Sequence, residues 1–238
     1  MSFKKTLKII GGIVIFLTLP SLLLFGFLYF KYDEELPQGI SGEQADILAE
    51  NMLTALDYKA FEDTVIIEWT FKNRRHYKWN KEKNTCAVEW QDYKVVLDLK
   101  DHDKSKAFVH GFTLDSDLAK EYIAKALKYY NNDSFWLVAP YKVFDPGTKR
   151  QKIDLTSDKT GLLVTYTSGG TTPGDSYLWI LDKDFKPTAF KMWVSIIPID
   201  GLEASWSDWT TTQTGAQLPT FHKFLIFGIE NTDIKTSD

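Results

Sequence analysis

The sequence has one cysteine and four histidines, which limits the metal sites and covalent crosslinks that it can form. Cys86 has no partner within the chain, so an internal disulfide and a cysteine-based metal cluster are both excluded. The histidines are His76, His102, His110 and His222. They lie far apart and share no metal-ligand spacing. We therefore predict no metal site and no cofactor.

Basic residues are also scarce beyond the N-terminus. Lys4, Lys5 and Lys8 come first, and the other 25 of the 28 basic residues are outnumbered by 32 acidic ones. Nucleic-acid-binding proteins need a basic surface, so we expect no nucleic-acid partner.

Known catalytic motifs are missing as well. The glycine-rich stretch Thr167–Gly174 lacks the helix that follows a phosphate-binding loop, so we interpret it as a hairpin connection or a rim. Glu68 and Glu89 fall on the polar face of predicted strands, where we expect them to pair with Lys78 and Lys94. We predict no catalytic residues. A glycosidase-like carboxylate pair stays open, because the sequence does not show separations in space.

One long apolar run is present near the N-terminus. Ile9–Phe30 is 22 residues without a charge, long enough as a helix to cross a hydrocarbon core of about 30 Å. A signal sequence is the alternative, but no small-residue cleavage site follows Phe27–Phe30. We predict a cytoplasmic N-terminus and transmembrane anchor over 1–31 and a tether over 32–40. The lysines before the run and the acidic residues 33–35 after it favour this orientation.

Two amphipathic helices are predicted after the tether. The first begins near Ser41 and presents one apolar face, formed by Ala45, Leu48, Ala49, Met52, Leu53 and Leu56. We expect this face to pack on the strands that begin at Thr64. The second helix ends at Asn132, and the apolar segment Ser134–Phe144, interrupted by Pro140, is predicted to be a short helix and loop.

Alternating aromatic-rich runs dominate the rest of the chain. The first four are Thr64–Phe71, Arg75–Asn80, Cys86–Trp90 and Tyr93–Leu99, and more follow between residues 151 and 227. They predict an α+β fold, in which a curled antiparallel sheet, a half-barrel of about 10–11 strands, is covered by helices on its concave side. We assign this domain to residues 41–230 and a flexible polar tail to 231–238.

Large aromatic side chains fall on the predicted inner face of this sheet. The candidate ligand-binding set is Trp69, Phe71, Trp79, Trp90, Trp136, Tyr177, Trp179, Phe190, Met192 and Trp206. A solid core and a core that encloses an apolar cavity are both compatible with this pattern. A cavity of this kind suits lipid-like ligands, because Trp and Tyr combine apolar area with a polar group.

The order of these elements resembles the LolA-like fold of periplasmic lipoprotein carriers and their lipid-binding relatives. The resemblance extends over about residues 41–227, and it is carried by Glu68-Trp-Thr-Phe71, His76-Tyr-Lys-Trp79, Phe135-Trp-Leu-Val138, Tyr177-Leu-Trp-Ile180, Phe190-Lys-Met-Trp193 and Trp206-Ser-Asp-Trp209. The chain also resembles uncharacterised envelope proteins of Bacteroidota-type bacteria. The resemblance implies a half-barrel whose concave face, closed by helices, accepts acyl chains.

Together these observations predict a non-enzymatic envelope protein that binds a lipid or an acylated protein. We expect a single-pass protein of the bacterial inner membrane with its domain on the periplasmic side. The carriers that it resembles are released from the membrane, so a tether favours local capture or handover of a lipid. An interaction module with a solid aromatic core, which binds another envelope protein, is the alternative. A hydrolase is a third and weaker hypothesis.

Overall fold

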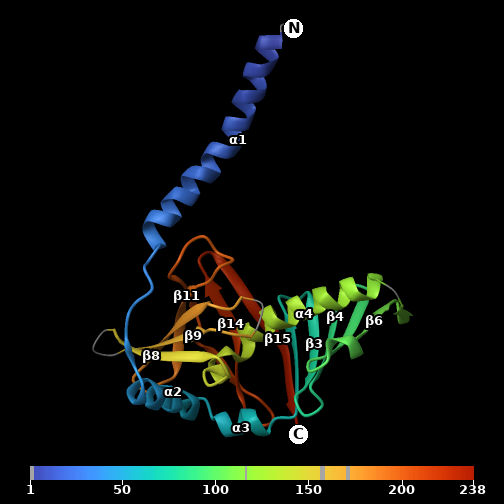
Figure 1. Ribbon diagram of the computed structural model, residues 1–238, viewed down its shortest axis with the longest axis vertical. Coiled ribbons are helices and arrows are strands. Elements are labelled where there is room, and N and C mark those ends of the chain that lie inside the picture. The colour runs from blue at the N-terminus through green and yellow to red at the C-terminus, as the bar shows by residue number, and fades with distance from the viewer. Residues whose placement is uncertain (1–2, 116, 156–158, 170–171) are drawn as a thin grey trace.

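In the computed structural model, an apolar N-terminal helix stands outside a domain built from one curled sheet and its covering helices (Figure 1). The structure describes residues 3–115, 117–155, 159–169 and 172–238. The α-helices in this part of the chain are α1 (Phe3–Tyr32), α2 (Glu43–Ala55), α3 (Tyr58–Asp63) and α4 (Asp117–Val138). Two 3₁₀ helices are η1 (His102–Lys104) and η2 (Ala139–Lys142).

The strands of the described residues form a single 15-stranded antiparallel sheet. They are β1 (Ile40–Ser41), β2 (Ile66–Phe71), β3 (Arg75–Asn80), β4 (Thr85–Trp90), β5 (Tyr93–Asp98), β6 (Lys106–Val109), β7 (Phe112–Leu114), β8 (Thr148–Asp154), β9 (Thr160–Tyr166), β10 (Ser176–Leu181), β11 (Pro187–Trp193), β12 (Leu202–Ser205), β13 (Asp208–Thr211), β14 (Gln217–Phe224) and β15 (Phe227–Ser237). Their order is β1-β8-β9-β10-β11-β12-β14-β15-β2-β3-β4-β5-β6-β7, with β13 paired to β14. The α+β class and the curled sheet are confirmed, with more strands than predicted.

Side-chain alternation along the first meander agrees with the sequence. In β2, Ile67 and Trp69 are buried, whereas the intervening Glu68 points outward and pairs with Lys78 of β3 at 2.7 Å. The expected pair between Glu89 and a lysine of the next strand also forms, again at 2.7 Å. The two-residue alternation of the sequence therefore predicts the inner and outer faces of this meander correctly.

The C-terminal residues 231–238 were expected to be a flexible tail, and this prediction is wrong. They continue β15, which pairs with β2 from Asn231 opposite Phe71 to Ser237 opposite Ile66. Asn231 is buried and donates to the Trp136 carbonyl at 3.1 Å. Pairing with β2 and hydrogen bonds of this kind compensate for the low hydrophobicity of the segment. β15 thereby joins the two meanders into one sheet.

The second long helix also differs from the prediction. α4 does not end at Asn132 but continues to Val138, so the segment predicted as a separate short helix and loop begins inside α4. The low helix propensity of two asparagines costs less than about 1 kcal/mol each, and burial of Leu137 on the sheet outweighs it, while hydrogen bonds compensate the buried Asp133 carboxylate. Pro140 lacks the amide hydrogen that an α-helix requires, and the chain tightens into η2 there.

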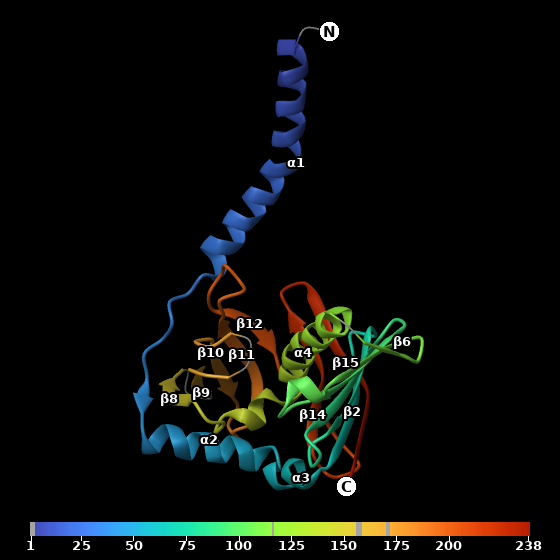
Figure 2. The same cartoon turned by 45° about the vertical axis from the view of Figure 1, so that its right-hand side comes forward.

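The two long helices of the domain contact different strands of the sheet. α2 contacts β8 and β9 of the second meander rather than the strands after Thr64, which corrects the expected packing of its apolar face. α4 contacts β4, β5, β6 and β14 and lies between the two meanders (Figure 2). One continuous core results, with residues from α2, from α4 and from both meanders.

α1 is long and apolar enough to cross a membrane over Leu7–Tyr32, and none of this window is buried. The tether that follows lies on the outer face of the second meander. The Trp193 indole N–H donates to the Glu34 carbonyl at 2.7 Å, and Gly39 approaches Ile153 of β8 closely. The end of α1 is therefore fixed to the sheet.

Candidate functional site

The ten predicted residues gather in the core beneath α4. β2 contributes Trp69 and Phe71, β3 Trp79, β4 Trp90, β10 Tyr177 and Trp179, β11 Phe190 and Met192, the β12–β13 link Trp206, and α4 itself Trp136. Seven are buried, and Trp79, Trp136 and Tyr177 are partly buried against the same core. The structure thus brings all ten into one apolar region, but α4 divides them into two groups.

The first group lies between β2–β5 and the N-terminal half of α4. The Trp69 ring stacks on Tyr77 with centroids 4.5 Å apart. Trp90 contacts Tyr129 of α4 edge-on at 5.5 Å, and Tyr93 of β5 stacks on Tyr122 of α4 at 4.5 Å. Aromatic contacts therefore hold this half of the helix on the sheet.

The second group lies under the C-terminal half of α4. Trp206 is at its centre, with Trp179 at 5.0 Å and Phe190 at 5.2 Å between ring centroids. The ring centroids of Trp136 of α4 and of Tyr177 each lie 5.5 Å from that of Phe190. This cluster joins the second meander to the helix.

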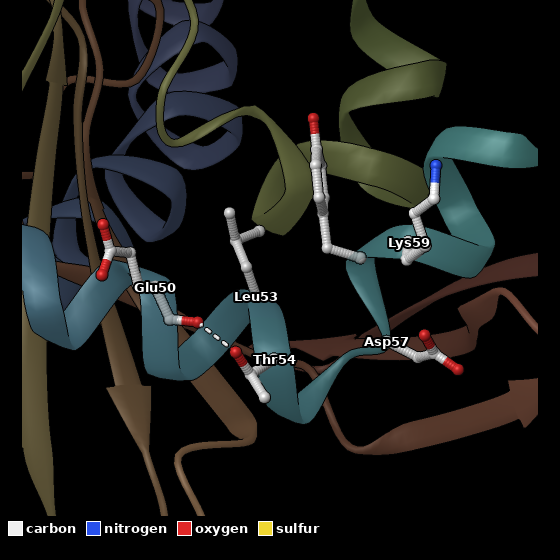
Figure 3. Close-up of a pocket in the computed structure, with 6 residues that line it drawn as sticks. Glu50, Leu53, Thr54, Asp57 and Lys59 are labelled. Atoms are coloured by element: carbon white, nitrogen blue, oxygen red, sulfur yellow. Dashed lines mark hydrogen bonds between the residues drawn. The ribbon is translucent and has the colours of Figure 1, made fainter.

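Buried side chains from the helices and from both meanders form one cluster in the interior. Two hollows, of about 380 and 340 Å³, lie at the surface around α2, and none of the ten residues lines either. Figure 3 shows the first, between Glu50, Leu53 and Thr54 of α2 and Asp57 and Lys59 beside it. A ligand-binding role for the ten residues stays a prediction, and it requires the packing beneath α4 to open.

Four buried indoles carry an N–H group without a hydrogen-bond partner among the described residues. They are Trp69, Trp90, Trp179 and Trp206. All four are at most 6% exposed. Outside this region, Trp193 and Trp209 both donate to backbone carbonyls, at 2.7 and 3.2 Å. An unsatisfied buried donor costs about 1–3 kcal/mol, which offsets part of the burial energy that the larger Trp ring gains over Phe at these positions.

A buried ion pair fixes α4 to the sheet near the C-terminal end of the helix. The Asp133 carboxylate is fully buried and accepts from Arg75 of β3 at 2.6 and 3.1 Å, and from the Tyr77 hydroxyl. The Arg75 guanidinium also lies 4.4 Å from the Tyr129 ring. Burial, together with the Asp133 charge, raises the pKa of Tyr77 well above its ordinary value, so its hydroxyl remains a donor.

No family model and no curated protein matches this chain. Among solved structures, it is similar to a DUF1329 family protein from Desulfovibrio piger, with 10% identity, a TM-score of 0.43 and coverage of 82% of this chain and 94% of that one. It is also similar to a Vibrio parahaemolyticus domain described as outer membrane lipoprotein-sorting, with 10% identity, a TM-score of 0.37 and coverage of 79% and 93%. At these values the likeness carries no inference about function. The resemblance to Bacteroidota envelope proteins finds no support in these comparisons.

His222 lies in the second group, and sequence reasoning considered it only as a metal ligand. Its Nδ1 is 2.9 Å from the Ser205 carbonyl oxygen and its Nε2 is 2.7 Å from that of Trp136. A neutral imidazole has one N–H and can donate to only one of these carbonyls. Burial lowers the pKa of His222, and the two carbonyls oppose that shift. Among the described residues, no three His, Cys, Asp or Glu side chains gather as metal ligands.

Asp133 is the residue that sequence reasoning missed most clearly. It lies seven residues after Ala126 and four before Leu137, on the same buried face of α4. A carboxylate at such a position signals a partner across the core. The partner, Arg75, is 58 residues away in sequence and begins a strand in which only the alternation of aromatic and polar residues was interpreted.

Proposed function

We propose that this chain is a non-enzymatic envelope protein, anchored by Ile9–Phe30, that binds a lipid or the acyl chain of a lipoprotein between α4 and the inner face of the sheet. The observation that carries the proposal is the set of unpartnered indole N–H groups beneath α4. Acyl chains match the apolar surface around them, and ester or amide carbonyls match the free donors. The sequence resemblance implies the same class of ligand.

The first part of α4, Asp117–Asn132, is the best candidate for the part that opens. Between Asp117 and Asn132 only Ala126 is buried, whereas the last six residues of the helix include four buried ones. The ion pair of Asp133 lies where these two parts of the helix meet, so the first part would move about this point. A ligand that enters under this first part would replace the contacts between α4 and Trp90 and would reach the Trp69 indole.

The position of this protein in the cell follows from the same proposal. Lysines precede the apolar helix and acidic residues 33–35 follow it, which favours a cytoplasmic N-terminus and a domain on the periplasmic side of the inner membrane. An anchored protein of this kind would capture or hand over a lipid at the membrane where it resides.

A second candidate is an interaction module for another envelope protein. The observation that favours it is the single cluster of buried side chains between the helices and the sheet, which suits a rigid scaffold. Under this alternative, the aromatic residues contribute only to stability.

Native mass spectrometry of the full chain in detergent micelles tests the first candidate. We expect one acyl-bearing molecule per chain, and we expect Trp90→Phe to reduce its occupancy because the variant removes a donor and keeps an aromatic ring. Trp193→Phe is the matched control, because its indole lies on the outer face and already has a partner. No bound lipid, or equal occupancy in both variants, would favour the scaffold.

A further inference from the structure

Two turns of the domain expose large apolar side chains at their tips. The loop between β11 and β12 carries Ile196, which is 71% exposed. The turn between β14 and β15 carries Ile226, which is 89% exposed, and Phe227, the first residue of β15, is 60% exposed. Outside α1, only Phe112 among the described residues is comparably exposed. Single exposed apolar residues are ordinary, but three at one end of a domain call for a physical explanation.

Both turns lie at the end of the domain from which α1 leaves, as the orange loop and the red hairpin show in Figures 1 and 2. Hydrogen bonds hold the first turn beside the tether. The Asp200 N–H donates to the Asp33 carboxylate at 3.0 Å, and the Glu34 N–H donates to the Asp200 carbonyl at 3.1 Å. Lys191 adds an ion pair with Glu34 at 2.7 Å. The loop therefore stays within hydrogen-bond distance of the first residues after α1.

The length of α1 sets the depth of these residues relative to a bilayer. Its candidate membrane span, Leu7–Tyr32, has 26 residues, with Lys8 and Lys31 near its ends, and measures roughly 39 Å at about 1.5 Å per residue. A hydrocarbon core is about 30 Å thick, so several residues of the helix extend into the headgroup region. Tyr29 and Tyr32 near the end of the helix suit that region. Asp33 and the loop bonded to it then lie at the membrane surface.

We infer that the tips around Ile196 and Ile226–Phe227 form a membrane-contact surface, which inserts into the interfacial region of the bilayer that α1 spans. This inference rests on the anchoring in the proposed function, and it adds a fixed orientation of the domain on the membrane. A bilayer is the occupant that fits, because α1 already holds the two tips at its surface, so that their insertion needs no large complementary surface. A stable protein interface needs about 800 Å² of complementary surface on each partner.

Spin labels on single-cysteine variants of the full chain in lipid nanodiscs test this surface. Labels at Ile196→Cys and Ile226→Cys report the tips, and power saturation with oxygen and with a water-soluble nickel complex reports their depth. Lys183→Cys is the control, because it lies in the exposed turn at the opposite end of β11. The native Cys86 is buried, and burial raises the pKa of its thiol, so it takes up no label.

We expect the two tip labels to be more accessible to oxygen than to nickel, and the Lys183→Cys label to show the reverse. Tip labels as accessible to nickel as the Lys183→Cys label would overturn the inference. A label at Val14→Cys, in the middle of α1, reports the anchoring separately. If Val14→Cys reads as membrane-embedded while both tips read as aqueous, the contact surface alone is wrong.

Discussion

Removal of the Asp133 carboxylate gives the sharpest test of how α4 is held on the sheet. Asp133→Ala leaves the Arg75 guanidinium, whose side chain is only 19% exposed, and the buried Tyr77 hydroxyl without their shared acceptor. Breaking a buried pair from one side costs about 3–5 kcal/mol. A domain of this size unfolds with about 5–15 kcal/mol in total, so the variant should lose a large fraction of its stability. Urea unfolding of the full chain in micelles, followed by Trp fluorescence, measures the change.

Two controls separate burial from charge. Glu89→Ala removes a carboxylate from a pair whose side chains are 50% and 44% exposed, and it should cost about 0–1 kcal/mol. Replacement of both Arg75 and Asp133 by Leu should cost less than Asp133→Ala alone, because no unpaired charge remains in the core. A cost below about 1 kcal/mol for Asp133→Ala would refute the reasoning.

Three further predictions follow from other parts of the core. Trp206→Phe should unfold within about 1 kcal/mol of the parent in urea, because removal of an unpartnered N–H offsets lost ring contacts; a loss of about 3 kcal/mol or more would contradict this. Because burial lowers the pKa of His222, the unfolded chain binds more protons than the folded chain below about pH 6.5, and the free energy of unfolding should decrease there as the pH is lowered. Urea titrations at several pH values should show a smaller decrease in His222→Gln. Deletion of residues 231–238 should lower the melting temperature markedly, because β2 loses one of its two partner strands; an unchanged melting curve would contradict the β15 assignment.

Local patterns in the sequence predicted most of the sheet and much of the helical structure. Alternation in β2, for example, identified Ile67 and Trp69 as inward-facing and Glu68 as outward-facing. The C-terminal strand was missed because its residues are polar and its partner strand lies about 165 residues earlier. The end of α4 was missed because the Arg75 that stabilises Asp133 comes from a distant strand. Both errors arise where tertiary contacts override local propensity.

The residues of the candidate site were predicted, but the sequence did not show whether they line an open cavity or a filled core. The period of two placed Trp179 and Phe190 on the inner face, and the structure brings them together beneath α4. Whether such a face is hollow or filled depends on how the helix packs against it, which no sequence period encodes. His222 was missed because the sequence shows neither its two carbonyl neighbours nor its contact with Trp206.

Photocrosslinking with a diazirine-bearing palmitate in native membranes tests the central claim most directly. The full chain is labelled, digested and mapped by mass spectrometry, and α1 serves as an internal positive control because it contacts lipid wherever it spans the bilayer. Lipid binding beneath α4 predicts additional crosslinks in β2, β4 or the first half of α4. Crosslinks confined to α1 and to the tips at Ile196 and Ile226 would contradict the claim.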